Sequence, residues 1–89
     1  MRLVWTDEAL GHLRVIRDFA PVQAERIVSA VEWLAHGPFP SMCPPLRDHS
    51  TEHVFVIVNT HHSVVYEIDG DEFLVLTVRD DRQRRTPRP

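Results

Sequence analysis

The chain contains no lysine, only one cysteine and three glycines, and no long apolar run. A single cysteine, Cys43, has no partner for a disulfide within the chain. The longest uninterrupted apolar stretch, Val54–Val58, is far shorter than the roughly 20 residues that span a bilayer. The amino-terminal residues turn acidic directly after Trp5 and show no apolar core of a secretory signal. These absences argue against a disulfide-rich secreted domain or a membrane protein, and we expect a bacterial protein of the cytoplasm.

The composition indicates one small globular domain. The chain has 89 residues, of which 43% are hydrophobic and 26% are charged. We expect the domain to comprise residues 1–82, followed by a basic, proline-containing tail at residues 83–89.

Charge is distributed unevenly along the chain. Residues 1–78 contain five arginines and eleven acids, whereas residues 79–89 contain five arginines and two acids. An acidic body does not favour broad electrostatic binding of nucleic acid, whose affinity depends on neutralised phosphates. The short basic tail could still contact phosphate or an acidic protein, and the simpler interpretation is a solvated terminus.

A short strand followed by two helices is predicted for the first part of the chain. Arg2–Trp5 has the composition of a strand, and Thr6 followed by two acids is a typical helix start. Apolar residues then recur at helical spacing as far as Ala20. Pro21 ends this helix and begins a second one, which Gly37 terminates.

Three strands are predicted for the second part of the chain, after a proline-rich loop at residues 38–50. Runs rich in Val, Ile, Phe and Tyr lie at about Glu52–Val58, His62–Ile68 and Glu72–Arg79. Asp69-Gly70 is a strong signal for a two-residue hairpin turn. The order β-α-α-β-β-β predicts an α+β domain, with a helical hairpin packed on a small antiparallel sheet.

The predicted turn at Asp69-Gly70 decides which side chains share a face, because side chains alternate along a strand. One face is then aliphatic and should meet the helices; its residues are Val54, Val56, Val58, Val65, Leu74, Leu76 and Val78. The other face should stay uncovered and bind a partner; its residues are His53, Phe55, Ile57, Val64, Tyr66, Phe73 and Val75. The alternatives are helices that cover both faces, or a longer turn that reverses the last strand.

Several stretches of the sequence together resemble a known family. Val4–Leu13 reads V-W-T-D-E-A-L-x-x-L, and Ile16–Ala20 reads I-R-D-F-A. The final two strands contribute V-V-Y-E-I-D-G-D at Val64–Asp71 and L-V-L-T-V-R at Leu74–Arg79. Over nearly its whole length the chain resembles the RelE/ParE toxins of type II toxin–antitoxin systems. The resemblance implies a cognate antitoxin that covers the sheet, neutralises the toxin and forms a hetero-oligomer with it.

Most of the basic positions typical of this family are replaced. His53 and His62-Ser63 stand where family members usually carry arginine, and Glu67 stands where another arginine is common. Arg79 and Arg82 keep the basic character at the end of the final strand. Because RNA cleavage needs cations that hold phosphate and stabilise the transition state, these departures weaken a ribonuclease interpretation.

For an enzyme of this family, the candidate catalytic residues are His62, Arg79 and Arg82. In the predicted register His62 lies near Thr77 and Arg79, as a general base beside an arginine that holds phosphate. The simpler interpretation places His62 as a surface residue at the start of a strand.

Six histidines raise the question of a metal site. The one group close in sequence comprises His49, His53, His61 and His62. Its His-x-x-x-His spacing brings ligands together only on a helix, and here it falls in a loop that leads into a strand. The sequence therefore predicts neither a metal nor another cofactor.

Three functions remain open from the sequence. The chain could be a toxin that binds DNA gyrase without catalysis, a ribosome-dependent mRNA endoribonuclease, or a degenerate, non-toxic interaction module of the same fold. The acidic body favours the first and the third. We expect a toxin that inhibits growth by binding gyrase and that its antitoxin neutralises.

Overall fold

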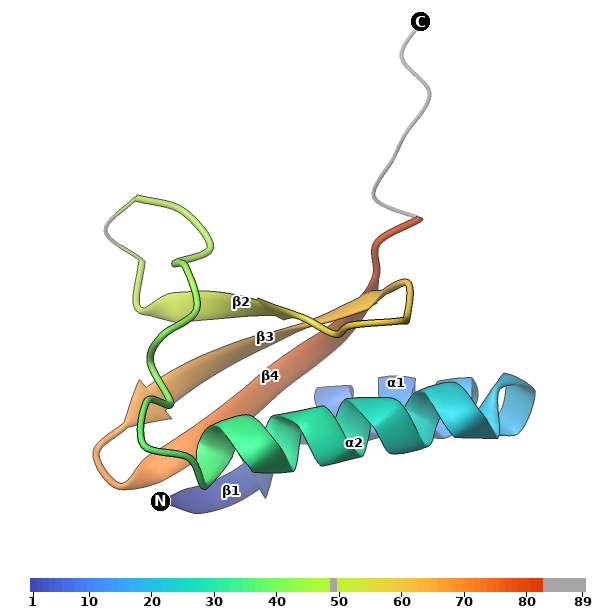
Figure 1. The fold of residues 1–89 in the computed structure, drawn as a ribbon, viewed down its shortest axis with the longest axis horizontal. Coiled ribbons are helices and arrows are strands. Elements are labelled where there is room, and N and C mark those ends of the chain that lie inside the picture. Colours follow the sequence, from blue (N-terminus) through green and yellow to red (C-terminus); the bar gives the residue numbers. More distant parts are fainter. Residues whose placement is uncertain (49, 83–89) are drawn as a thin grey trace, which may run out of the picture.

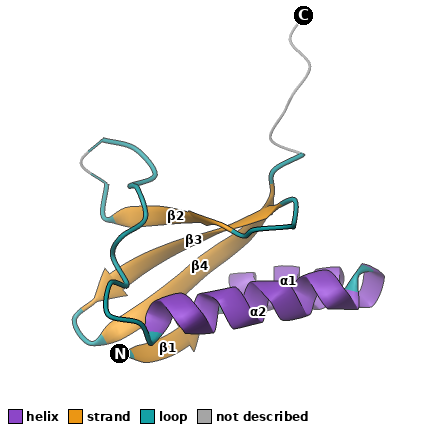
Figure 2. Ribbon diagram, in the orientation of Figure 1, coloured by secondary structure: helices purple, strands orange, loops and turns teal. Residues whose placement is uncertain are grey.

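The computed structural model describes residues 1–48 and 50–82, which form four strands and two helices (Figures 1 and 2). The elements are β1 (Arg2–Trp5), α1 (Asp7–Phe19), α2 (Pro21–Ala35), β2 (Glu52–Val56), β3 (His62–Asp69) and β4 (Glu72–Asp80). The predicted α+β class and the order of elements are therefore confirmed. His49 and the predicted tail at residues 83–89 lie outside the described residues. None of the helices in the described parts is long and apolar enough to cross a membrane.

The start of α1 is fixed to the sheet by Thr6. The Thr6 hydroxyl oxygen accepts a hydrogen bond from the Ala9 amide at 3.3 Å, which caps the helix as predicted. The same hydroxyl lies 2.8 Å from the carbonyl oxygen of Val75 and 2.9 Å from that of Leu76. Thr6 therefore links the first turn of α1 to the middle of β4. Pro21 occupies the first turn of α2, where its missing N–H costs nothing.

The sheet has the strand order β1-β4-β3-β2 and is mixed. β2, β3 and β4 form the predicted antiparallel meander, whereas β1 pairs with β4 in parallel. The expectation of a purely antiparallel sheet is corrected at this edge. The parallel pair follows from the topology, because the helical hairpin carries the chain from β1 across the sheet before β2 begins.

The register between β3 and β4 differs from the predicted one in two ways. Asp69 pairs with Glu72, so Gly70 and Asp71 form the turn, one position later than expected. Gly70 adopts the positive φ of 60° that favours glycine. A β-bulge then adds one residue to β4: Tyr66 pairs with Val75, and Val65 pairs with Thr77. Leu76 is the extra residue.

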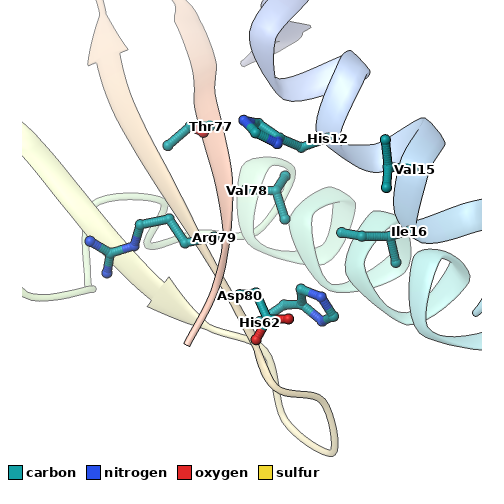
Figure 3. Close-up of a pocket in the computed structure, with 8 residues that line it drawn as sticks. All are labelled: His12, Val15, Ile16, His62, Thr77, Val78, Arg79 and Asp80. Carbon is teal, nitrogen blue, oxygen red and sulfur yellow. The ribbon is translucent and has the colours of Figure 1, made fainter. Parts of the chain in front are cut away.

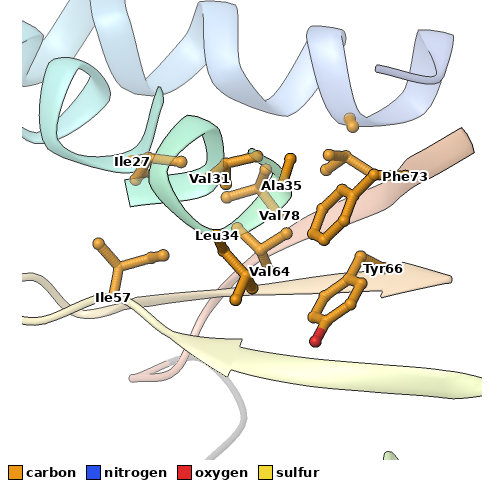
Figure 4. Close-up of a cluster of buried hydrophobic side chains, with 11 residues drawn as sticks. Ile27, Val31, Leu34, Ala35, Ile57, Val64, Tyr66, Phe73 and Val78 are labelled. Carbon is orange, nitrogen blue, oxygen red and sulfur yellow. The ribbon is translucent and has the colours of Figure 1, made fainter. Parts of the chain in front are cut away.

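The core lies between the helices and the face of the sheet that we expected to be open (Figure 4). Tyr66, Phe73, Val64 and Val75 have no exposed surface, and Ile57 is 2% exposed. They pack against a stripe of α2 that consists of Ile27, Val31, Leu34 and Ala35. The predicted orientation of the sheet is therefore wrong. The aromatic face offers larger side chains to fill the space beneath the helices than the valine-rich face does.

The face of the sheet opposite the helices has no helix on it within the described residues. We call it the open sheet face; by strand alternation it comprises an apolar and polar centre of Val4, Val54, Val56, Ser63, Val65, Leu74, Leu76, Thr77 and Arg79, and a charged end of Arg2, Glu52, Glu67, Asp69 and Glu72. Val56 is 63% exposed at the edge of this face, and Val65 is buried at its centre. Of the residues predicted to meet the helices, Val78 alone belongs to the core beneath them, because the bulge at Leu76 reverses the end of β4.

A stack of three rings joins the core to the long loop before β2. Tyr66 lies between His53 and Phe73, with ring centroids 5.1 Å and 4.3 Å away and nearly parallel planes. The Tyr66 hydroxyl donates a hydrogen bond to the Pro40 carbonyl oxygen at 2.8 Å. Nδ1 of His53 lies 2.8 Å from the Cys43 carbonyl oxygen. These two hydrogen bonds hold the loop against the ring stack. Burial raises the pKa of Tyr66.

Candidate functional site

His62 and Arg79, two of the three candidate catalytic residues, lie on opposite faces of the sheet (Figure 3). His62 pairs with Asp80 and points toward α1, whereas Arg79 pairs with Ser63 and points to the open sheet face. Without the bulge at Leu76, the register at the turn would align His62 with Arg79. The extra residue separates them, so the predicted pair of a base and a phosphate-holding arginine is not formed.

His62 lies in a groove between α1 and the end of β4 (Figure 3). The groove has a volume of about 430 Å³, and His12, Val15 and Ile16 of α1 line its other wall. His62 is only 8% exposed, and its Nδ1 atom is buried without a hydrogen-bond partner among the described residues. Burial lowers the pKa of His62, and the nearby Asp80 carboxylate opposes this effect. The surface position that the simpler interpretation assigned to His62 is therefore wrong as well.

Arg82, the third candidate, is held by Asp80. Its Nε atom donates to one carboxylate oxygen of Asp80 at 3.2 Å, and Nη2 donates to the other at 3.0 Å. The Arg82 amide also donates to Asp80 at 3.0 Å. These bonds hold the pKa of Asp80 below its usual value. Because both oxygens of Asp80 accept from Arg82, fewer of its N–H groups are available to bind a phosphate.

Arg79 is the basic group at the end of β4 on the open sheet face. Its Nη2 atom lies 3.5 Å from the Ser63 hydroxyl, and that hydroxyl donates to Asp81 at 2.7 Å. The Nε atom of Arg79 is buried and forms no hydrogen bond within the described part of the chain. An unsatisfied N–H of this kind is costly unless a partner molecule accepts from it. On the same face, Ser63 lies opposite Arg79 on β3, and Thr77 precedes it by two residues on β4.

The predicted partner-binding residues are part of the core instead of an exposed surface. Five of them, namely Ile57, Val64, Tyr66, Phe73 and Val75, are inaccessible beneath the helices. His53 and Phe55 are partly buried on the same side. The reason for assigning a partner to these residues was their expected exposure, and that reason no longer holds.

Two features of the site were missed at the level of the sequence. The apolar residues of the open sheet face, such as the exposed Val56 and the half-buried Leu76, were assigned to the core. The one feature of the sequence that could have revealed this is side-chain volume. The valines and leucines of this face are smaller than the aromatic residues of the other face, which therefore fills the core better. His12 also escaped notice, because it lies on the polar side of an amphipathic helix and lines the groove with His62 only through the tertiary fold.

The histidines do not form a metal centre within the described residues. Across residues 1–48 and 50–82, no three His, Cys, Asp or Glu side chains are grouped so that they could hold a metal ion. His53 is engaged with the loop carbonyl of Cys43, and His62 lies in the groove beside α1.

Comparisons with known proteins agree with this architecture. The family model described as the ParE toxin of the type II toxin–antitoxin system, parDE, matches residues 3–85. A solved structure described as the chromosomal ParDE TA system from P. aeruginosa superposes with a TM-score of 0.75 at 19% identity. The superposition covers 90% of this chain and 95% of that chain, and it supports the fold. A search of curated proteins gives no match.

Proposed function

The chain belongs to the ParE toxin family of type II toxin–antitoxin systems, and we propose that it inhibits growth by binding DNA gyrase rather than by cutting RNA. The observation that carries the proposal is the separation of His62 from Arg79 by the bulge at Leu76. General acid–base cleavage of a phosphodiester needs a proton-transfer group and a phosphate-holding cation at one reacting centre. The described residues do not bring these groups together on either face.

An acidic body suits a protein target better than a nucleic acid. Residues 1–78 carry six more negative than positive charges, so long-range attraction to RNA phosphates is weak. A toxin that acts by occupying a protein needs only a complementary surface. Gyrase is the target that the family resemblance implies.

The open sheet face is the surface that we propose for the antitoxin. Val56 is exposed and the other valines and leucines at its centre are half-buried or buried, and the helices already occupy the other face. Arg79 adds a specific polar contact, because its buried Nε atom lacks an acceptor. An apolar antitoxin segment with one carboxylate or carbonyl oxygen placed at Arg79 would satisfy both features.

A second candidate function is an mRNA endoribonuclease centred on Arg79. It is favoured by one observation, the buried Nε–H of Arg79 that lacks an acceptor and that would donate to a phosphate oxygen. This candidate function lacks a general base, because His62 lies on the opposite face of the sheet from Arg79. The third possibility, a degenerate interaction module, would keep the open sheet face but would leave growth unaffected.

Controlled induction of the chain in bacteria distinguishes these functions. We expect growth arrest that is preceded by DNA-damage signalling, with protein synthesis maintained at first. The Arg79→Gln variant should still arrest growth, because no phosphate needs to be held. A rapid loss of protein synthesis that Arg79→Gln abolishes would instead establish the endoribonuclease. Normal growth with folded, expressed protein would establish the degenerate module.

A further inference from the structure

The edge of β4 that faces away from β3 is only partly paired. β1 pairs with β4 from Glu72 to Val75 and no further, because the chain leaves the sheet at Thr6 to begin α1. Figure 1 shows that β4 continues past the short strand β1. Along Thr77–Asp80, no strand of the described residues lies on this edge. An unpaired strand edge offers backbone donors and acceptors to another chain.

The backbone groups that face this edge belong to Val78 and Asp80. The Asp81 amide donates to the His61 carbonyl oxygen at 2.7 Å, on the β3 side of the strand. Residues of an antiparallel pair alternate between those that bond the neighbouring strand and those that face away from it. Arg79 therefore bonds β3, and the N–H and C=O groups of Val78 and Asp80 point outward. Within the described residues, no backbone group outside the strands bonds to these outward groups.

The unpaired edge at Thr77–Asp80 forms one wall of the groove that holds His62 (Figure 3). Val15 and Ile16 of α1 form the opposite wall, and Val15 is 55% exposed. The groove has a volume of about 430 Å³, which leaves room for several side chains. An occupant would bury apolar surface of α1 while it meets the unpaired backbone of β4.

His62 adds a polar requirement to this groove. Its side chain is 8% exposed, and Nδ1 is buried without a hydrogen-bond partner among the described residues. A buried polar atom of this kind destabilises the fold unless a bound group satisfies it. A side-chain amide fits either tautomer of the ring, because it carries both a donor and an acceptor.

The opposite edge of the sheet is protected by the loop before β2. The Val54 amide donates to the Pro44 carbonyl oxygen at 3.0 Å, and the Leu46 amide donates to the Glu52 carbonyl oxygen at 2.7 Å. No segment of the described chain covers Thr77–Asp80 in this way. Because proteins usually cover or shorten an exposed edge, an open edge beside a groove indicates a place for a partner strand.

We propose that an extended segment of a partner protein pairs with Thr77–Asp80 as a fifth strand and fills the groove beside α1. The four residues of this edge span about 13 Å, so about five residues of the partner become ordered. Every second side chain of the partner strand points toward α1. The pattern that fits is an apolar residue over Val15 and Ile16, with a glutamine or asparagine two residues away for His62. A helix does not suit this edge, because its backbone groups are already bonded within it.

This surface differs from the open sheet face, and the inference goes beyond the proposed function. The partner strand lies in the plane of the sheet, and its specific side-chain contacts are on the α1 side. An antitoxin on the open sheet face and a strand on the β4 edge therefore use different groups of this chain. Each of the two proposals can fail without the other.

The test uses the capped peptide Lys-Gln-Thr-Val-Thr-Gln-Lys, which has valine between two glutamines on one side and reads the same in both directions. NMR titration of the isotope-labelled full chain should shift the amides of Val78 and Asp80, slow their hydrogen exchange, and shift the ring nitrogens of His62. Val15→Glu should weaken the affinity at least about fivefold, because it places a charge in an apolar contact. Val22→Glu, at a side chain of α2 that is 57% exposed, is the matched control and should keep the affinity.

Two methylated versions of the peptide test the backbone pairing. Only alternate residues of a strand turn their N–H groups toward the neighbouring strand. Methylation of the valine amide nitrogen and methylation of a threonine amide nitrogen should therefore differ, so that one abolishes binding and the other preserves it.

Several outcomes would overturn the proposal. The first is the absence of shifts at millimolar peptide, and the second is shifts confined to the open sheet face. Equal losses of affinity in Val15→Glu and Val22→Glu, or with the two methylated peptides, would indicate attraction without strand pairing. Dimerisation of the chain that the peptide prevents would assign the edge to a second copy instead of a partner protein.

Discussion

His62 and Arg79 would be neighbours across β3 and β4 if β4 lacked one residue. The turn pairs Asp69 with Glu72, and the same register carried along the strands would place His62 opposite Arg79. The bulge at Leu76 shifts the pairing, so His62 meets Asp80 beneath α1 while Arg79 meets Ser63 on the open sheet face. One inserted residue therefore decides which chemistry the final strand can support.

The burial of His62 predicts a pH-dependent stability. The pKa of His62 lies below its ordinary value of 6.5 because burial disfavours the charged ring. The nearby carboxylates of Asp80 and Asp81 raise this pKa, whereas Arg82 and His61 lower it further. The unfolded chain then binds the proton more readily than the folded one. The free energy of unfolding should be highest above pH 6.5 and should fall as the pH drops through the folded pKa.

Chemical denaturation between about pH 7 and about pH 5 measures this effect. His62→Gln should flatten the slope of stability against pH, whereas His61→Gln, a change at the exposed neighbour, should keep it. Equal slopes in the parent chain and in His62→Gln would contradict the account.

The hydrogen bond from Tyr66 to the loop predicts a modest loss of stability in Tyr66→Phe. The substitution keeps the stacked rings of His53 and Phe73 but removes the donor to the Pro40 carbonyl. The free energy of unfolding should decrease by about 1 kcal/mol. Denaturant melts give this value, and Tyr66→Ala should cost about 3–5 kcal/mol because it also leaves a cavity. A Tyr66→Phe variant as destabilised as Tyr66→Ala would contradict the assigned role of the hydroxyl.

If the antitoxin binds the open sheet face, a substitution at an exposed residue of this face should weaken the complex without changing the stability of the fold. Val56→Glu changes a side chain that is 63% exposed, so the free energy of unfolding should change by less than about 0.5 kcal/mol. The same charge placed in an apolar interface should weaken the antitoxin complex at least about tenfold. Val15→Glu, at a side chain that is 55% exposed on α1, is the control and should leave the complex intact. Calorimetry of the toxin–antitoxin complex measures both. If Val56→Glu binds the antitoxin as tightly as the parent chain, the complex does not use this face.

The pair between Arg82 and Asp80 predicts that Arg82 is dispensable for growth arrest. Arg82→Gln removes the bonds that lower the pKa of Asp80, so that pKa should rise toward its usual value in an NMR titration. Growth arrest after induction should persist, because a binding toxin needs no cation at this position to hold phosphate. Loss of toxicity in a folded Arg82→Gln variant would favour the endoribonuclease.

The sequence was sufficient to predict the elements of this fold but not the faces of its sheet. Thr6, Pro21 and Gly37 mark the helix boundaries by local chemistry that depends little on the rest of the chain. The faces depend on the position of the turn and on the bulge at Leu76. Both sides of strands β2 to β4 are rich in apolar residues, so hydrophobic alternation gave no decisive signal.

The candidate catalytic residues could not be placed for the same reason. A bulge has no sequence signature in the run L-V-L-T-V-R, and each one-residue shift moves a side chain to the opposite face. The wrong register did not affect the predicted family, because the resemblance depends on the pattern of the whole chain and not on the pairing of two strands.

The most direct test of the central claim is DNA supercoiling by purified gyrase in the presence of increasing amounts of the purified chain. The account predicts that the chain inhibits supercoiling in proportion to its occupancy of gyrase, and that His62→Gln and Arg79→Gln inhibit equally well. Undiminished supercoiling at saturating, folded protein, together with cleavage of ribosome-bound mRNA by the same preparation, would contradict it.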